Sequence, residues 1–273
     1  MRRTVFLFIL SLAGCSVSGT ENAPSPRIVS LVPSATETLY LLGAEEHIVG
    51  VSSVDSSLGK TIVGSMIKPD YEKILSLKPD IVIITLPMQR KVKEELEKAG
   101  LKTLAVNPES IQDIFNSIIR LGTLVHREER AHYIVDSLRS QMREVLNGRK
   151  FHYRAFVELW YDPLYTAGDS TFIDDIMEHL GLENVFSDRR GYFQVQQEEV
   201  IERNPEVIII SHRPSKPPRR RKFWEDISAV RNGYIIYMNP DLLNRPGPGF
   251  VRGMDFLVNA LDSLERIAPL PSR

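Results

Sequence analysis

Two glutamates occupy the same place in a repeated pattern. Glu72 lies in "YEKILSLKPDIVIIT", and Glu198 lies in the related stretch "QEEVIERNPEVIII", 126 residues further along the chain. Each copy has an apolar spacing typical of a helix, a proline break and then a β-branched run. One such carboxylate complements a helix dipole and needs no further role. Its repetition predicts two like charges far apart on one face, which suits a two-fold receptor with arginines on each subunit.

Other residues with metal-binding or catalytic chemistry do not gather into motifs. We find no P-loop, G-x-G-x-x-G, G-x-S-x-G or H-E-x-x-H pattern, and the six histidines lack zinc-like spacing. Only His212 follows a predicted strand closely enough to touch a ligand, including as an axial ligand to iron or cobalt. Met66, Met88 and Met238 offer soft ligands, although methionine more often fills a core or a pocket wall. The sequence therefore predicts a binding protein without a resident cofactor, not an enzyme.

The chain begins with "MRRTVFLFILSLAGC", which has a basic start and an apolar stretch. The stretch is shorter than the roughly 20 residues that span a bilayer, but it suits a signal peptide over residues 1–14. "LAGC" resembles a bacterial lipobox, so we expect lipidation at Cys15, the only cysteine. Residues 15–26 would form a lipidated tether, and the protein would lie in the cell envelope. The alternative is a plain signal peptide with an incidental cysteine.

Size and charge limit the classes of partner. The 273 residues and 42% hydrophobic content suffice for two domains, each with a core. The 34 basic and 35 acidic side chains leave no global attraction for nucleic acid or for an anionic membrane, so the membrane contact is expected through the lipid alone.

From residue 27 onward, short apolar strands alternate with helix-period segments. Near-continuous apolar runs favour parallel strands that are covered on both faces. We expect two Rossmann-like α/β lobes, residues 27–124 and 151–273, joined by a long inter-lobe helix within residues 125–150. Ser34 is expected to cap the first helix, with Glu37 completing a capping box. The predicted strands are "RIVSLVP", "HIVGVS", "TIVGS", "DIVIITLP", "KTLAVN", "RAFVELW", "LYTAG", "VIIISH" and "YIIYMN"; the predicted helices are 34–42, 71–77, 91–99, 111–121, 127–146, 171–180 and 223–230.

Open α/β sheets bind ligands at the carboxyl ends of their strands, so the cleft between the lobes is the expected site. A single stiff helix between the lobes predicts little closure on binding. The residues placed at the strand ends are Pro33, Ser34, Ser52, Met66, Leu86, Met88, Trp160, Tyr161, Tyr165, His212, Asn239 and Asp241, with Arg245 at the cleft edge as a partner for a carboxylate or phosphate.

Several motifs in order resemble the substrate-binding lipoproteins of ABC importers for vitamin B12, siderophores and haem. These motifs are "RIVSLVPSATETLYLLGAEEHIVGVS", "YEKILSLKPDIVI", "IQDIFNSIIRLGTLVHREERA", "PLYTAGDSTFIDDIMEHLGLENVF" and "NRPGPGFVRGMDFLVNAL". The resemblance covers residues 27 to about 267. It implies that the chain is a monomer whose Glu72 and Glu198 dock on arginines of a permease dimer with its ATPase subunits.

The resemblance also implies a ligand class. Met66 and Tyr192 stand six residues before the two glutamates, at positions that are pocket tryptophans in the cobalamin binders, and Leu86 also replaces an aromatic residue. An apolar slot of corrin or porphyrin size remains, and we expect a cobalt corrinoid. A haem or ferric siderophore is the alternative within the same fold, and an oxyanion such as molybdate is a further one. From another class, the chain would be a chelate-processing enzyme, or a scavenging lipoprotein without a transporter.

One charged run, "RPSKPPRRRKF" from Arg213 to Phe223, stands apart from the motifs. Its prolines and consecutive cations predict a solvated loop. Because it follows a cleft-forming strand, it is also a candidate lip that meets anionic ligand groups or the permease. The run lacks interleaved aromatics, so we expect no nucleic-acid partner.

Overall fold

The computed structural model describes residues 26–267. The predicted signal peptide, Cys15 and all of the tether except its last residue lie outside this range. Within residues 26–267, no helix has both the length and the apolar content needed to cross a membrane.

The N-lobe is built around a four-stranded parallel sheet with the order β2-β1-β3-β4. Its β-branched strands are buried on both faces, as their continuous apolar sequence predicted. The elements are β1 (Ile28–Ser30), α1 (Pro33–Leu41), η1 (Glu45–His47), β2 (Ile48–Val51), η2 (Ser53–Leu58), α2 (Tyr71–Ser76), β3 (Ile81–Ile84), α3 (Arg90–Lys98), β4 (Thr103–Ala105) and α4 (Ile111–Leu124).

The C-lobe has a second parallel sheet, with the order β11-β10-β5-β8, and a small antiparallel sheet, β6-β7-β9. Its elements are β5 (Arg154–Glu158), β6 (Trp160–Tyr161), β7 (Leu164–Ala167), α6 (Phe172–Leu180), β8 (Glu183–Asn184), β9 (Tyr192–Gln194), α7 (Gln197–Arg203), β10 (Val207–Ile210), η3 (Pro218–Arg220), α8 (Ser228–Asn232), β11 (Ile235–Tyr237) and α9 (Pro240–Leu243).

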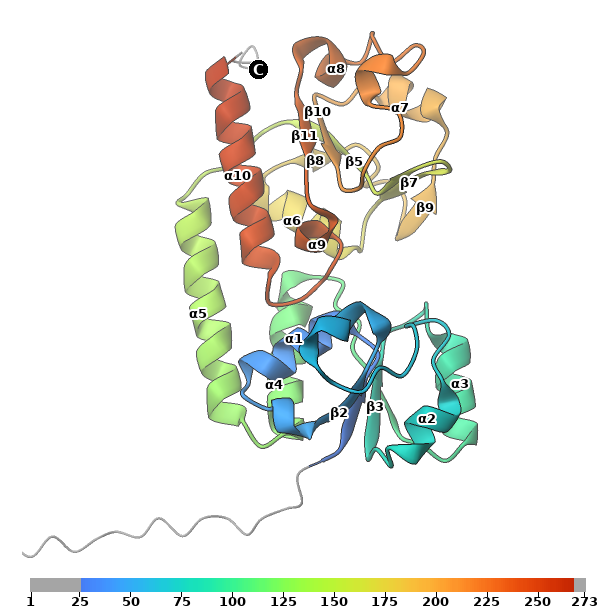
Figure 1. Cartoon of the computed structure of the whole chain (residues 1–273). Helices are drawn as coiled ribbons and strands as arrows, with labels where there is room; N and C mark the ends of the chain where they lie inside the picture. The colour runs from blue at the N-terminus through green and yellow to red at the C-terminus, as the bar shows by residue number, and fades with distance from the viewer. Residues whose placement is uncertain (1–25, 268–273) are drawn as a thin grey trace, which may run out of the picture.

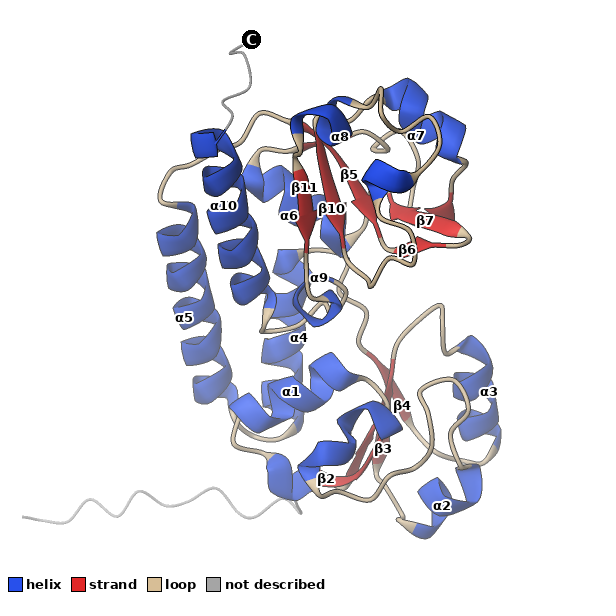
Figure 2. Cartoon of the chain, turned by 45° about the horizontal axis from the view of Figure 1, so that its top comes forward, coloured by secondary structure: helices blue, strands red, loops and turns tan. Residues whose placement is uncertain are grey.

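Helix α5 (Glu128–Leu146) joins the lobes, and α10 (Phe250–Ile267) packs beside it along the same side of the molecule (Figures 1 and 2). One continuous apolar core includes residues of α4, α5, α10 and both parallel sheets. Gly122 of α4 permits close packing there, because a Cβ at this position would lie 2.4 Å from the Cβ of Ala131 in α5. The predicted two lobes with one long connecting helix are confirmed.

A second contact between the lobes comes from the "RPGPGF" turn before α10. A Cβ on Gly247 would lie 2.7 Å from the Cβ of Ser34, so only glycine lets the turn approach the start of α1 this closely. Arg252 of α10 also forms an ion pair with Glu37 of α1 at 3.5 Å. The turn therefore connects the C-lobe to the N-lobe.

Three local predictions were wrong. Ser34 does not cap α1: the N-cap is Val32, with Pro33 at the first helical position, where its missing N–H has no cost. "TIVGS" forms isolated bridges at Ile62 and Gly64 and no strand. The helix predicted over 223–230 is restricted to α8, because Arg221 and Trp224 are instead buried in a non-helical segment.

Candidate ligand-binding site between the lobes

A cavity of about 770 Å³ lies between the N-lobe and the C-lobe. This volume falls within the range of about 300–1,000 Å³ that is typical of small-molecule sites. The lining side chains are mostly apolar, with a small number of polar groups among them. Such a surface favours a bulky ligand held by apolar contact and oriented by a few hydrogen bonds.

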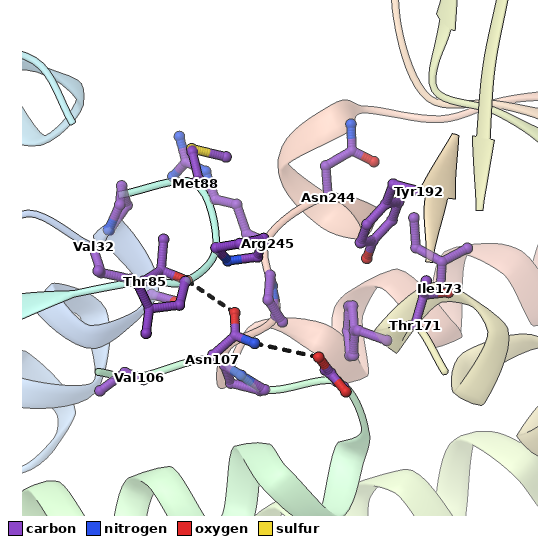
Figure 3. Close-up of a pocket in the computed structure, with 18 of the residues that line it drawn as sticks. Val32, Thr85, Met88, Val106, Asn107, Thr171, Ile173, Tyr192, Asn244 and Arg245 are labelled. Carbon is purple, nitrogen blue, oxygen red and sulfur yellow. Dashed lines mark hydrogen bonds between the residues drawn. The ribbon is translucent and has the colours of Figure 1, made fainter. Parts of the chain in front are cut away.

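The N-lobe wall is formed where parallel strands end. Residues 32–34 follow β1, residues 85–88 follow β3, and residues 106–109 follow β4. Thr85 donates a hydrogen bond from Oγ1 to Oδ1 of Asn107 at 3.1 Å, and Nδ2 of Asn107 is 3.4 Å from Oε1 of Glu109 (Figure 3). These bonds connect the ends of two strands, so the polar groups on this wall are held in fixed positions.

A buried glutamine supports the same wall from behind. Gln89 is fully buried; its Oε1 accepts from the backbone N–H of Thr85 at 2.6 Å, and its Nε2 donates to the carbonyl of Met66 at 2.7 Å. One side chain therefore holds together two separate segments that line the cavity. We missed Gln89 from the sequence because it precedes a helix and does not end a strand.

The C-lobe wall consists of Leu159 after β5, residues 170–173 at the start of α6, residues 191–192 at β9 and residues 244–246 after α9. Thr171 caps α6, its Oγ1 accepting from the backbone N–H of Asp174 at 3.1 Å. Asn244 is held by Ser211, whose Oγ donates to Oδ1 of Asn244 at 2.7 Å. Both polar residues are therefore constrained by neighbouring elements.

Tyr192 faces Thr85 and Asn107 across the cavity (Figure 3). Burial, followed by the negative charge of Glu109 on the N-lobe, raises the pKa of Tyr192 to about 12. The phenol therefore stays protonated at neutral pH and is available to donate a hydrogen bond. Its ring offers a flat apolar surface to a ligand.

Arg245 brings positive charge to the cavity. It forms an ion pair with Asp241 at 3.1 Å. It also lies near Asp55 and Glu37 of the N-lobe, where its positive charge partly opposes a rise in their pKa values. Burial is the larger influence on both carboxyls, and it raises their pKa values above the usual ones. The arginine side chain remains 41% exposed, so it is accessible to an anionic group of a ligand.

The structure brings together about half of the residues that we assigned to the cleft. The lining includes Pro33, Ser34, Met66, Leu86, Met88, Tyr192 and Arg245. The remaining predicted residues lie outside it: Ser52, Trp160, Tyr161, Tyr165, His212, Asn239 and Asp241.

His212 shows why a strand end alone did not suffice. It is buried, and its Nε2 is 2.8 Å from Oε1 of Glu158. Arg221 donates a hydrogen bond to the same glutamate, and its guanidinium lies over the ring of Tyr161. This placement does not support our axial-ligand hypothesis, since His212 lies outside the cavity lining and its Nε2 contacts a carboxylate. Among residues 26–267, moreover, no group of three or more histidine, cysteine, aspartate or glutamate side chains could hold a metal ion.

Other lining residues could have been found from the sequence. Asn107 and Glu109 follow β4 at its carboxyl end, which is the rule that placed the other N-lobe residues. Thr171 and Ile173, by contrast, lie at the start of α6, where no strand ends. Their placement depends on how the C-lobe is oriented over the N-lobe.

The two repeated glutamates do not line the cavity. Glu72 is in the first turn of α2 and Glu198 in the first turn of α7, and both are exposed. These helices lie at opposite ends of the molecule, on the side away from α5 and α10 (Figures 1 and 2). Asp70, not Glu72, caps α2, accepting from the backbone N–H of Lys73 at 3.0 Å. The capping role thus falls to another residue, and Glu72 remains available for a partner.

Comparisons with known proteins agree with this architecture. Residues 28–242 match the family described as periplasmic binding protein. An uncharacterized ABC transporter substrate-binding lipoprotein of Bacillus subtilis is 29% identical over 250 residues, which cover 86% of this chain and 79% of that protein. A vitamin B12-binding protein of Pectobacterium atrosepticum is 28% identical over 278 residues, covering 97% of this chain and 98% of its own. The crystal structure of a possible iron-binding (periplasmic solute-binding) protein of Staphylococcus epidermidis has a TM-score of 0.76 and 31% identity, covering 87% of this chain and 99% of that one.

Proposed function

The chain belongs to the periplasmic binding protein family, and we propose that it is the substrate-binding lipoprotein of an ABC importer that captures a corrinoid. The observation that supports this most is the cavity between the lobes, which has a volume of about 770 Å³ and largely apolar walls. The similarity to a vitamin B12-binding protein along nearly the whole chain supports the corrinoid in particular.

The cavity fits a chelate whose metal is already coordinated. The side chains around it offer apolar surface, a protonated phenol at Tyr192 and a positive charge at Arg245. These groups suit the organic periphery of a ligand: flat faces, amides and carboxylates or phosphates. Recognition would therefore depend on the shape of the chelate and on its substituents.

A ferric or haem chelate is the second candidate within the same function. It is supported by the 31% identity to the possible iron-binding protein of Staphylococcus epidermidis. The replacement of aromatic residues by Met66 and Leu86 in the cavity also favours a ligand that differs from cobalamin.

Calorimetric titration of the polypeptide that lacks residues 1–25 tests these assignments. Cobalamin, cobinamide, haem and ferric siderophores are titrated in parallel into the wild type and into Tyr192→Ala. Binding of a corrinoid that weakens in the variant would support the proposal. Tight binding of an iron chelate alone would replace the corrinoid by the second candidate. The absence of binding by all four ligands would overturn both.

Delivery would depend on the two exposed glutamates. We propose that Glu72 and Glu198 meet arginines on the two subunits of a permease dimer and that the protein acts as a monomer anchored through Cys15. Support comes from the position of the glutamates, one per lobe, at opposite ends of one side of the molecule. ATPase subunits would then drive uptake of the released ligand.

A further inference from the structure

The segment from Arg213 to Phe223 forms a surface that the proposed function does not use, and we call it the basic segment. Its exposed cations, with no acidic residue among them, are Arg213, Lys216, Arg219, Arg220 and Lys222. Within the described chain, the ion pair made by this segment belongs to a sixth cation, Arg221. The net charge of the whole protein is −1, so removing these five positive charges leaves −1 − 5 = −6 on the rest. The basic segment is therefore a local exception on a negative body.

The basic segment is held in place by a buried ion cluster. Arg221 is 2% exposed and donates from Nη2 to Oε1 of Glu158 at 2.7 Å and from Nε to the carbonyl of Lys216 at 2.9 Å. Its guanidinium lies over the rings of Tyr161 and Trp224, at 4.1 Å and 4.3 Å from their centroids. Because Arg221 fixes the backbone at this point, its neighbours have less backbone freedom to lose on binding.

An aromatic residue ends the cationic surface. Phe223 is 57% exposed, has a φ of 66°, and carries the Nζ of Lys222 4.5 Å from its ring centroid. Cations beside an exposed aromatic ring suit a membrane interface, where the charges meet lipid phosphates and the ring lies at headgroup level. The segment does not line the cavity, so our expectation of a lip around the ligand is not supported.

The position of the basic segment is consistent with a membrane contact. It precedes α8 and lies at the outer end of the C-lobe, the end that also carries α7 with Glu198 (Figure 1). In the proposed function, α7 approaches a permease embedded in the membrane, which brings the basic segment near the same membrane.

We infer that the basic segment binds the headgroups of anionic phospholipids and orients the C-lobe toward the membrane. This inference goes beyond the proposed function and depends on it only for the location of the protein at a membrane. The electrostatic attraction of each exposed cation for the phosphates of an anionic bilayer adds to that of the others.

Vesicle co-sedimentation of the polypeptide that lacks residues 1–25 tests the inference. The vesicles are phosphatidylcholine alone, or phosphatidylcholine with phosphatidylglycerol. We expect partitioning at least about tenfold stronger onto the anionic vesicles at low salt, and a decline as salt rises. The triple variant Arg219→Glu, Arg220→Glu and Lys222→Glu should lose this preference.

A matched control changes the net charge equally elsewhere. Lys68, Lys91 and Lys102 are exposed lysines of the N-lobe, and their replacement by glutamate should leave the vesicle preference within about twofold, because they are remote from the basic segment. Thermal unfolding of both triple variants checks that they fold. A milder triple variant with glutamine at positions 219, 220 and 222 should show an intermediate loss and a shallower salt dependence.

Three outcomes would overturn the inference. One is equal partitioning of the wild type onto neutral and anionic vesicles. Another is an equal loss in the control variant, which would attribute the effect to net charge. The third is that the triple variant Arg219→Glu, Arg220→Glu and Lys222→Glu binds vesicles as the wild type does but impairs ligand transport, which would assign the segment to the permease. Failure of the proposed function is distinguishable, because it appears in the ligand titration, which needs no vesicles.

Discussion

Arg221 donates from Nη2 to Oε1 of Glu158 at 2.7 Å, and neither side chain is accessible to solvent. His212 contacts the same carboxylate at 2.8 Å, so one buried glutamate at the end of β5 joins two residues that follow β10. This cluster determines the path of the chain after β10. It explains why a run of cations that we predicted to form a solvated loop contributes one arginine to the interior.

Removing that arginine should destabilise the protein strongly. Arg221→Met leaves Glu158 buried with only His212 as a partner, and breaking a buried ion pair in this way costs about 3–5 kcal/mol. Urea unfolding followed by fluorescence measures the loss. Arg219→Met is the control: its side chain is exposed, and we expect a change within about 0.5 kcal/mol. Equal stability of the two variants would show that the cluster does not support the C-lobe.

The paired glutamates should matter for delivery and not for capture. Glu72→Ala combined with Glu198→Ala removes one carboxylate from each lobe, and each truncated ion pair at a desolvated interface costs about 2–5 kcal/mol. We expect ligand uptake in reconstituted vesicles to fall at least about tenfold at limiting protein, with ligand affinity unchanged.

The control for this pair lies on α5. Glu129→Ala combined with Glu144→Ala removes two exposed carboxylates from the opposite side of the molecule and should leave uptake unchanged. Uptake that is normal in the Glu72 and Glu198 double variant would refute the docking assignment. A parallel loss of ligand affinity would point to an indirect effect through the fold.

Tyr192 should contribute through its ring and its hydroxyl. Tyr192→Phe removes only a neutral hydrogen bond, which is worth about 1 kcal/mol or roughly fivefold in affinity. Tyr192→Ala also removes the aromatic surface and should weaken binding at least about tenfold. Calorimetry measures the affinity of both variants for whichever of the four titrated ligands binds the wild type most tightly. Since the pKa of the phenol is about 12, the affinity should show no step from this residue until the pH approaches that value. Equal affinities of wild type and both variants would place the ligand elsewhere.

Asp55 should make stability depend on pH with a defined sign. Burial raises its pKa above the usual 3.8, so the folded state holds the proton more tightly than the unfolded state does. The carboxylate therefore costs stability as the pH rises through the raised pKa. Asp55→Asn removes this cost, and its free energy of unfolding relative to wild type should increase from pH 4 to pH 7. Chemical denaturation across this range measures the difference, and a constant or shrinking difference would contradict the burial argument.

The sequence by itself determined the architecture and much of one cavity wall. Continuous β-branched runs can be buried on both faces only in covered parallel sheets, which predicted two α/β lobes. The long helical pattern between them predicted α5, which joins the lobes. Pro33, Met66 and Leu86 were placed near the cavity because parallel strands end at a common edge, or because they match a family motif. Local spacing is sufficient for these features.

Only the tertiary structure decided which strand-end residues reach the ligand side. His212 and Tyr161 end up around Glu158 and Arg221, whereas Thr171, from a helix start, reaches the cavity. The reason is physical: a buried carboxylate needs charged or hydrogen-bonding partners, and here they come from residues 54 and 63 positions away in the chain. Sequence spacing cannot show such a requirement, because it depends on the packing of β5, β10 and the segment that follows.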